Sequence, residues 1–308
     1  MKKAAFLFPG QGSQYVGMGR DVYEKYDSVK LLFNIASETM GLDMAKTIFS
    51  GTEEELKQTH ITQSSIYLIN ASLFTALQET RGTNPDYTAG HSLGEYSAFF
   101  AAGVFDFETG MKLVKARGEC ILEASKLNPG SMAAMIGGGR ESVLKLCEEA
   151  KKEGVLEAVN FNSPDQIVVA GTKEAIMYAV QNARAFGIKK AVELKVSGAF
   201  HSSLMNHAFE SFKTFVNSAS FSDPRVPVVT NYSAAARTEA AVLKEDAALQ
   251  IKNPVLWDKS IGFMKERGVE TFYEIGPGKV LAGLNKRIFP EALAINIDGA
   301  AKIDELEK

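Results

Sequence analysis

The sequence predicts an α/β fold in which a large domain with a parallel sheet carries a smaller inserted domain. Three short apolar segments each run into glycines and then into a helical pattern, in AAFLFPGQGSQ, DYTAGHSLGEY and TFYEIGPGKVLAG. A repeated order of strand, tight turn and helix indicates parallel strands, whose ligands gather at their carboxyl ends. We therefore expect the three glycine turns to line one crevice.

The first strand is expected at residues 4–8, and helical patterns between the strands are expected to cover the sheet. In SSIYLINASLFTALQETRG, for example, a helix is predicted because apolar residues recur at helical spacing before Gly82 supplies a stop. These apolar residues are Ile66, Ile69, Leu73 and Leu77.

Residues 128–196 follow a different order, strand, helix, strand, strand, helix, strand, which is typical of a ferredoxin-like unit. The turn signal of residues 162–165, Asn-Ser-Pro-Asp, predicts that the middle strands form a hairpin. We interpret this segment as a domain inserted between residues 1–127 and 197–308. Its strands lack the basic and aromatic pattern that RNA-binding sheets need, which favours a lid or wall for the crevice.

Composition narrows the class of partner. The 308 residues include 34 Lys+Arg and 37 Asp+Glu, for a net charge of −3, and neither sign forms a long run. We therefore expect neither nucleic acid nor a membrane surface as a partner. No apolar stretch approaches the ~20 residues of a membrane span, and the first apolar run is too short for a secretion signal.

The chain has two cysteines, Cys120 and Cys147, which cannot make a disulfide framework or a metal cluster. Both fall in helical patterns, where we expect them to be small buried apolar residues. This cysteine usage favours a cytoplasmic protein with no metal site.

The segment TAGHSLGEYSAFFAAG contains a Gly-x-Ser-x-Gly motif centred on Ser92. The motif follows the short strand DYTA and opens a helix that ends at Gly103, which is the context of a nucleophile elbow. This context favours Ser92 as a nucleophile over a structural turn serine. His91 is a poor candidate for its base, because consecutive side chains in a sharp turn diverge.

Three other histidines could supply the base. We expect His60 in a polar loop before a helix, and His207 on the solvated side of its helix. His201 follows the strand pattern AVELKVSGAF and precedes a helix, so it lies at a chain turn from which a side chain can reach a crevice. This position favours His201 as the base over an ordinary loop histidine.

The glycine segments FPGQGSQ and IGGGRES do not complete a dinucleotide fingerprint, since Tyr15 and Ser142 stand where the third glycine belongs. Glu141 would also oppose a pyrophosphate at the start of the second helix. The first segment could instead present backbone N–H groups across the crevice from Ser92.

Arg117 is an anomaly in the helix MKLVKARGECILEA, because it falls in the apolar stripe between Leu113 and Ile121. A buried guanidinium needs a carboxylate or phosphate to accept its fork of donors. Two interpretations stay open at this point: an acidic side chain of the protein, or the carboxylate of a substrate.

Together these motifs resemble the malonyl-CoA:acyl carrier protein transacylases and the acyltransferase domains of polyketide synthases. The resemblance runs along nearly the whole chain, through FPGQGSQ, GHSLGE, Arg117, SGAFHSSLM, Gln250 in ALQIKNPVLW, and EIGPG. It implies an α/β-hydrolase-like large domain with a ferredoxin-like insert. It also implies a serine acyltransferase of fatty acid synthesis that moves malonyl from malonyl-CoA to the phosphopantetheine thiol of acyl carrier protein by a ping-pong route.

Carried over residue by residue, the resemblance makes Ser92 the nucleophile and His201 the base. It implies an oxyanion hole from the backbone N–H groups of Gln11 and Leu93, and a bidentate grip of Arg117 on the malonyl carboxylate. Phe200 would disfavour an α-methyl group on the substrate, and the backbone carbonyl of Gln250 would orient His201. A coenzyme A thioester would be the substrate, with no permanently bound cofactor, and we expect a monomer.

Two other classes of function stay open. A serine hydrolase of carboxylated thioesters would differ mainly in letting water reach the acyl-serine, although ordinary α/β-hydrolases place their histidine later in the chain. A non-catalytic module that binds carrier protein could keep the same fold.

Overall fold

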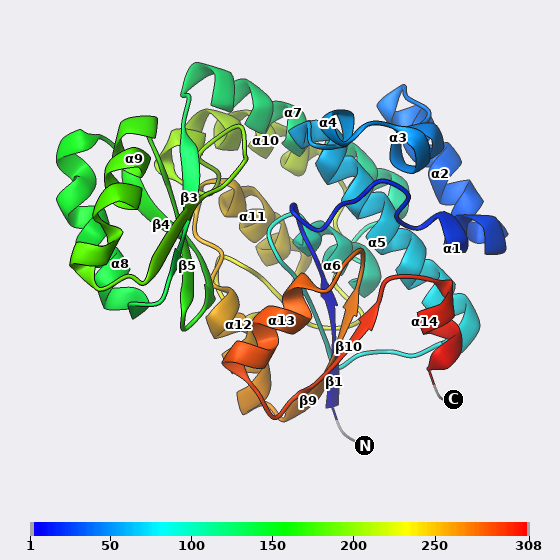
Figure 1. The fold of residues 1–308 in the computed structure, drawn as a ribbon. Helices are drawn as coiled ribbons and strands as arrows, with labels where there is room; N and C mark the ends of the chain where they lie inside the picture. The colour runs from blue at the N-terminus through cyan, green and yellow to red at the C-terminus, as the bar shows by residue number, and fades with distance from the viewer. Residues whose placement is uncertain (1–2, 307–308) are drawn as a thin grey trace.

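Strand β1 (Lys3–Phe8) lies inside the larger of two sheets, in a computed structural model that describes residues 3–306 (Figure 1). Successive side chains of a strand point to opposite faces of the sheet, so β1 contributes side chains to two separate hydrophobic cores. Phe6 and Phe8 belong to the core under most of the helices, whereas Ala5 and Leu7 pack in a second core with Trp257. The larger sheet is therefore covered on both faces.

The larger sheet has the strand order β10-β9-β1-β2-β7-β8. The first five strands are parallel, and β8 pairs antiparallel with β7. Since β9, β1 and β2 are parallel neighbours, the three glycine turns that follow them lie at the same end of the sheet, where these strands have their carboxyl ends. The α/β class predicted from the sequence is confirmed. The bounds are β2 (Tyr87–Gly90), β7 (Val228–Val229), β8 (Ala236–Arg237), β9 (Val269–Ile275) and β10 (Leu293–Ile297).

Helix α5 (Thr59–Arg81) is the central helix of the larger unit and is buried along most of its length. It ends at Gly82, whose φ of 61° places it in the left-handed region, as the sequence predicts. It begins earlier than expected, because the carbonyl of Gln58 already accepts the N–H of Thr62. The prediction of a loop at His60 is therefore wrong, since His60 lies in the first turn of α5.

The other helices of the larger unit surround α5 or cover the opposite face. Those on the α5 side are α1 (Arg20–Lys25), α2 (Asp27–Met40), α3 (Met44–Ser50), α4 (Glu53–Leu56), α6 (Gly94–Ala102), α7 (Phe107–Leu127), α10 (Asn206–Ser218), α11 (Ala240–Leu249) and α14 (Ala300–Glu305). Those on the other side are α12 (Trp257–Glu266) and α13 (Val280–Ile288).

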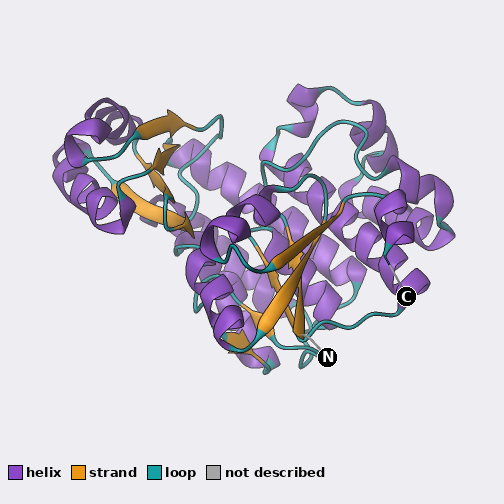
Figure 2. Ribbon diagram, turned by 60° about the horizontal axis from the view of Figure 1, so that its bottom comes forward, coloured by secondary structure: helices purple, strands orange, loops and turns teal. Residues whose placement is uncertain are grey.

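The smaller sheet is antiparallel and has the order β4-β5-β3-β6. Its helices cover one face, and its other face packs on Ala199, Phe200 and Leu204 of the larger unit (Figure 2). Along the chain its elements are β3 (Ser131–Ile136), α8 (Gly139–Glu149), η1 (Ala150–Glu153), β4 (Leu156–Ser163), β5 (Gln166–Gly171), α9 (Lys173–Asn182), η2 (Ala183–Phe186) and β6 (Lys190–Glu193).

Two details of this sheet differ from the sequence prediction. The last strand ends at Glu193, before the end of the strand pattern AVELKVSGAF, and Leu194 makes one further main-chain bond, from its N–H to Met132 O. Asn162 belongs to β4 and not to the turn of the predicted hairpin, which is otherwise confirmed by the antiparallel pairing of β4 with β5.

Main-chain hydrogen bonds join the smaller sheet to the larger unit. Phe161 N–H donates to Val255 O at 2.9 Å, and Val255 N–H donates to Val159 O at 2.8 Å. Arg140 forms an ion pair with Asp258 at 2.9 Å close to this bridge. The smaller sheet is thus fixed beside the edge where the glycine turns lie.

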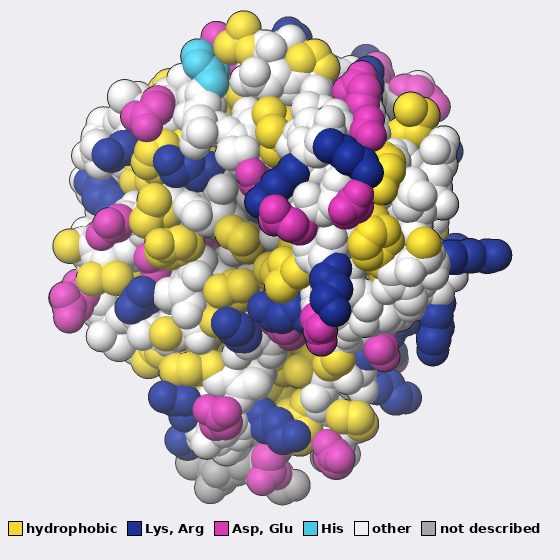
Figure 3. All heavy atoms as spheres, turned by 90° about the vertical axis from the view of Figure 1, so that its left-hand side faces the viewer, with side chains coloured by type: hydrophobic (Ala, Val, Ile, Leu, Met, Phe, Trp, Pro, Cys, Tyr) yellow, Lys and Arg dark blue, Asp and Glu magenta, His cyan; other side chains and the backbone are white. Residues whose placement is uncertain are grey.

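The outer face of the smaller unit carries cations and anions side by side rather than gathered by sign (Figure 3). Both cysteines are free and buried, as predicted. Among residues 3–306, the longest helices are too polar or too short to pass through a bilayer.

Candidate active site

The turn between β2 and α6 holds Ser92 in a strained conformation. Its φ is 51°, and only His201 and Ala234 share a positive φ among the non-glycine residues of 3–306. Such a backbone costs about 1–3 kcal/mol and persists only where its surroundings enforce it. Here Ser92 N–H donates to Asn231 Oδ1 at 2.7 Å, and Asn231 Nδ2 donates to Gly90 O at 2.6 Å.

The turn also needs glycine at position 94, because its backbone packs against β1. A Cβ on Gly94 would stand 2.0 Å from the carbonyl oxygen of Phe8, which cannot move without breaking the sheet. We expect Gly94→Ala to lower the free energy of unfolding by at least about 2 kcal/mol, as overpacking does. Urea unfolding followed by circular dichroism measures this loss.

Gly262→Ala is the matched control, since a Cβ there, in the middle of α12, meets open space. It should raise stability by about 0.5–1 kcal/mol, the usual gain of alanine over glycine in a helix. Equal effects of the two substitutions would show that the packing of Gly94 on β1 is unimportant.

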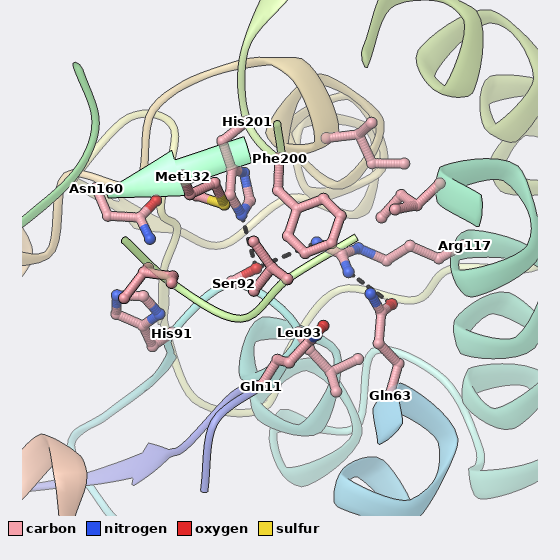
Figure 4. A pocket seen from close by; sticks show the side chains of 14 residues that line it. Gln11, Gln63, His91, Ser92, Leu93, Arg117, Met132, Asn160, Phe200 and His201 are labelled. Atoms are coloured by element: carbon pink, nitrogen blue, oxygen red, sulfur yellow. Dashed lines mark hydrogen bonds between the residues drawn. The ribbon is translucent and has the colours of Figure 1, made fainter. Parts of the chain in front are cut away.

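Ser92 and His201 are hydrogen-bonded, with 2.7 Å between Ser92 Oγ and His201 Nε2 (Figure 4). The other ring nitrogen, Nδ1, lies 2.8 Å from the backbone carbonyl of Gln250. A carbonyl can only accept, so Nδ1 carries the proton and Nε2 is the acceptor for the serine hydroxyl. This geometry makes Nε2 able to take a proton from Ser92.

His201 is 3% exposed and lies in the segment that leads from β6 of the smaller sheet back to the larger unit. Burial, reinforced by the positive charge of Arg117, lowers its pKa from 6.5 to about 3. The imidazole is therefore neutral at physiological pH and free to act as a base.

Arg117 is buried in α7, as its place in an apolar stripe suggests. It donates from Nη1 to Gln63 Oε1 at 2.6 Å, and from Nη2 to Gln250 Oε1 at 2.9 Å and Ser92 Oγ at 3.3 Å. Within residues 3–306 no carboxylate forms an ion pair with it. Of the two interpretations left open by the sequence, a structural ion pair therefore fails.

A cavity of about 90 Å³ lies beside these groups. Gln11 and Leu93 line it, and no backbone acceptor among residues 3–306 is bonded to the N–H group of either residue. Phe200 lies next to His201 on the same cavity, between the base and Arg117 in Figure 4. The remaining lining residues are Gln63, His91, Ser92, Ile121, Met132, Asn160, Leu194, Val196, His201 and Ile251, together with Arg117.

His91 does not bond to Ser92. Its Nε2 lies 2.7 Å from Asn162 Oδ1 of the smaller sheet, and its ring packs at 5.5 Å from that of Trp257. Burial lowers its pKa, so it too is neutral. His207 is exposed on α10, as predicted, with its nearest acidic atom on Glu123 at 3.6 Å.

A second cavity, of about 370 Å³, shares Gln11, His91, Asn160 and Leu194 with the first. It extends between the smaller sheet and α13, and exposed Arg287 borders it. The two cavities are therefore neighbours, and the first is lined by Ser92.

Four residues of the site escaped the sequence analysis: Gln63, Glu95, Asn162 and Asn231. A signal existed for Glu95, because the residues three, four and seven positions later on its helix are all apolar. The same test that singled out Arg117 would have found it. The other three are uncharged polar residues, whose sequence positions carry no comparable anomaly.

Comparison with known proteins agrees with the geometry. The family model for the acyl transferase domain matches residues 5–299. The chain is 42% identical over 289 residues to the malonyl CoA-acyl carrier protein transacylase of Bacillus subtilis strain 168, covering 94% of this chain and 91% of that protein. It is 43% identical over 288 residues to the Escherichia coli K12 protein of the same name, covering 94% and 93%.

Solved structures are equally similar. An acyl-carrier-protein S-malonyltransferase from Burkholderia pseudomallei 1710b aligns with a TM-score of 0.95 at 38% identity, over 98% of each chain. A malonyl-transacylase in complex with its type II polyketide synthase acyl-carrier protein aligns with a TM-score of 0.95 at 37% identity, also over 98% of each chain.

Proposed function

The chain belongs to the acyl transferase family, among the malonyl-CoA:acyl carrier protein transacylases, and on that premise we propose the reaction that its site performs. It transfers malonyl from coenzyme A to the phosphopantetheine thiol of acyl carrier protein for fatty acid synthesis. One observation carries the proposal: a buried arginine that forms no ion pair with a carboxylate of residues 3–306 lies 3.3 Å from the hydroxyl of a serine that is bonded to a neutral histidine.

In the first half-reaction, Ser92 Oγ attacks the thioester carbon while its proton moves to His201 Nε2. The oxyanion that forms is held by the backbone N–H groups of Leu93 and Gln11, each of which is worth about 10²–10³ in rate in comparable sites. The carbon–sulfur bond then breaks, and His201 returns the proton to the departing thiol of coenzyme A. A malonyl-serine ester remains.

The free carboxylate of the malonyl group supplies the anion that Arg117 lacks. Burial raises the pKa of Glu95, whose carboxyl group acts electrostatically on Arg117, from 4.5 to about 8, which favours its uncharged form at neutral pH. A planar fork of donors suits a carboxylate better than a thioester or methyl group. Phe200 limits the space beside the malonyl α-carbon and so disfavours an α-methyl group.

In the second half-reaction, the thiol of the carrier's phosphopantetheine enters along the second cavity and attacks the ester. His201 takes the thiol proton and returns it to Ser92 Oγ as the ester breaks. Because one thioester replaces another, the transfer is close to neutral in free energy.

The finer assignments rest on the same premise. We propose that residues 1–127 and 197–308 form an α/β-hydrolase-like catalytic domain and that residues 128–196 form a ferredoxin-like insert. The order β4-β5-β3-β6 and the separate core under α8 and α9 support this division. We further propose a cytoplasmic monomer that uses a coenzyme A thioester without a bound cofactor.

The test is to incubate the protein with radiolabelled malonyl-CoA without acceptor and to map any adduct by mass spectrometry. We expect one malonyl ester on Ser92, discharged by the carrier thiol faster than by water. Steady release of free malonate without an adduct would indicate a hydrolase. An inert protein that still binds carrier would indicate a non-catalytic module.

The rate of acylation should begin to fall only at an unusually low pH. kcat/KM reports the groups of the free enzyme, and the pKa of His201 there is about 3. We expect the rate of acylation by malonyl-CoA to stay level as the pH falls from about 7 to about 5, where an ordinary histidine would be protonated. Rapid-quench acylation across this range measures it.

Arg117→Ala tests whether the charge of Arg117 contributes to the low pKa of His201. Removing the neighbouring cation should raise the pKa of His201 and move the acid limb upward, toward 6.5. Wild-type acylation that falls by half near 6.5 would contradict the prediction.

A further inference from the structure

Glu95 lies in the first turn of α6, three residues after Ser92, and is fully buried. Its Oε2 accepts the backbone N–H of Asn231, and its Oε1 accepts Gln250 Nε2 at 3.0 Å. The carboxyl group therefore bonds to two residues that themselves hold the site. Asn231 Oδ1 accepts the backbone N–H of Ser92, as described above. Gln250 is hydrogen-bonded to Arg117 and His201.

Gln250 is completely buried and uses three of its polar atoms on the site. Its backbone oxygen accepts from His201 Nδ1, and its Oε1 accepts from Arg117 Nη2. Its Nε2 donates to Ser92 O at 2.8 Å as well as to Glu95. One side chain thus joins the backbone of the nucleophile to the arginine, and its own backbone orients the base.

The two ends of an amide have nearly the same shape, so their orientation is decided by the partners. Glu95 Oε1 and Ser92 O are both acceptors, and they draw the Nε2 end of Gln250 toward them. Oε1 then points at Arg117. A reversed amide would point its NH₂ group at a cation, and the guanidinium would lose an acceptor in a buried site.

We propose that Glu95 is a positioning residue that fixes the side chain of Gln250 and, through it, holds Arg117 where it selects a carboxylated acyl group. This inference rests on the malonyl transfer proposed above. A carboxyl group suits the task, because its two oxygens accept the backbone N–H of Asn231 and the Nε2 of Gln250 at the same time.

Glu95→Gln tests the proposal, since it keeps the size of the side chain but replaces one oxygen with an NH₂ group, which cannot accept the N–H of Asn231 or of Gln250. We expect the ratio of kcat/KM for malonyl-CoA to that for acetyl-CoA to fall about tenfold or more, the value of one hydrogen bond to a charged group. Glu95→Asp keeps both acceptors on a shorter stem and should restore part of the ratio.

Leu77→Ala is the matched control for lost stability. Leu77 is a buried core residue of α5 that lies outside both cavities, so its loss should lower the melting temperature and leave the acyl ratio unchanged. A Glu95→Gln protein with reduced rates but the wild-type ratio would overturn the proposal, because a purely structural role moves both acyl groups alike.

Gln250→Met gives an independent route, also if Glu95→Gln fails to fold, because it removes the amide itself while filling its space. It should lower the same ratio, and adding Glu95→Asp to it should have little further effect on that ratio. Additive effects would show that Glu95 does not act through Gln250. A wild-type protein without preference for malonyl would instead refute the proposed function, which separates the two failures.

Discussion

Ser92→Ala removes the proposed nucleophile, and we expect it to abolish the malonyl adduct and to lower transfer to carrier protein by about 10⁶-fold, as loss of a catalytic serine does elsewhere. The reason is that, in the part of the chain that the structure describes, Ser92 supplies the one hydroxyl that is hydrogen-bonded to His201 Nε2. Intact-mass spectrometry after exposure to malonyl-CoA measures the adduct, and a coupled assay with carrier protein measures the transfer.

Ser72→Ala is the control for loss of a buried hydroxyl. Ser72 lies in α5 with no hydrogen-bond partner for its Oγ among the residues described, so alanine should leave activity and stability at their wild-type values. Transfer at a normal rate by the Ser92→Ala protein would place the reacting group elsewhere and refute the mechanism.

Arg117→Ala should reverse the acyl preference of the protein. Loss of one partner of a buried charge pair costs about 2–5 kcal/mol, so kcat/KM for malonyl-CoA should fall by about 30- to 5,000-fold. Acetyl-CoA should become a better substrate than malonyl-CoA, since its methyl group no longer faces a buried cation. Single-turnover acylation with each thioester measures both changes.

Arg117→Lys separates charge from geometry. It keeps the cation but loses the fork, and should give an intermediate preference, because bidentate recognition of carboxylates needs a guanidinium. An unchanged preference for malonyl in the alanine variant would assign the recognition of the carboxylate to another residue.

The sequence predicted the residues whose chemistry conflicts with their surroundings. Ser92 stands in a turn that only glycine neighbours permit, and Arg117 stands on an apolar helix face, so each is visible from local pattern alone. His201 was found by elimination among four histidines. The parallel strands were predictable because their apolar runs end in glycine turns, which are local features too.

The features that the sequence did not predict depend on contacts between distant parts of the chain. Asn162 was assigned to a turn because its neighbours are turn formers, yet β4 extends through it and directs its side chain to His91. His60 was assigned to a loop because its neighbours are polar, yet the packing of the larger unit buries that polar stretch as the first turn of α5. In both cases long-range packing outweighs local propensity.

The main-chain bridge between β4 and Val255 has a consequence for engineering. Chimeras between related acyltransferases would take the four-stranded unit as a cassette cut at its two chain crossings. In this protein the cassette has a third attachment, since Val255 completes the ladder of β4 and the next residue, Leu256, donates its N–H to Asn231 O at 3.0 Å. A transplanted unit that brings β4 without a matching segment around Val255 would therefore disturb Asn231, which accepts the backbone N–H of Ser92.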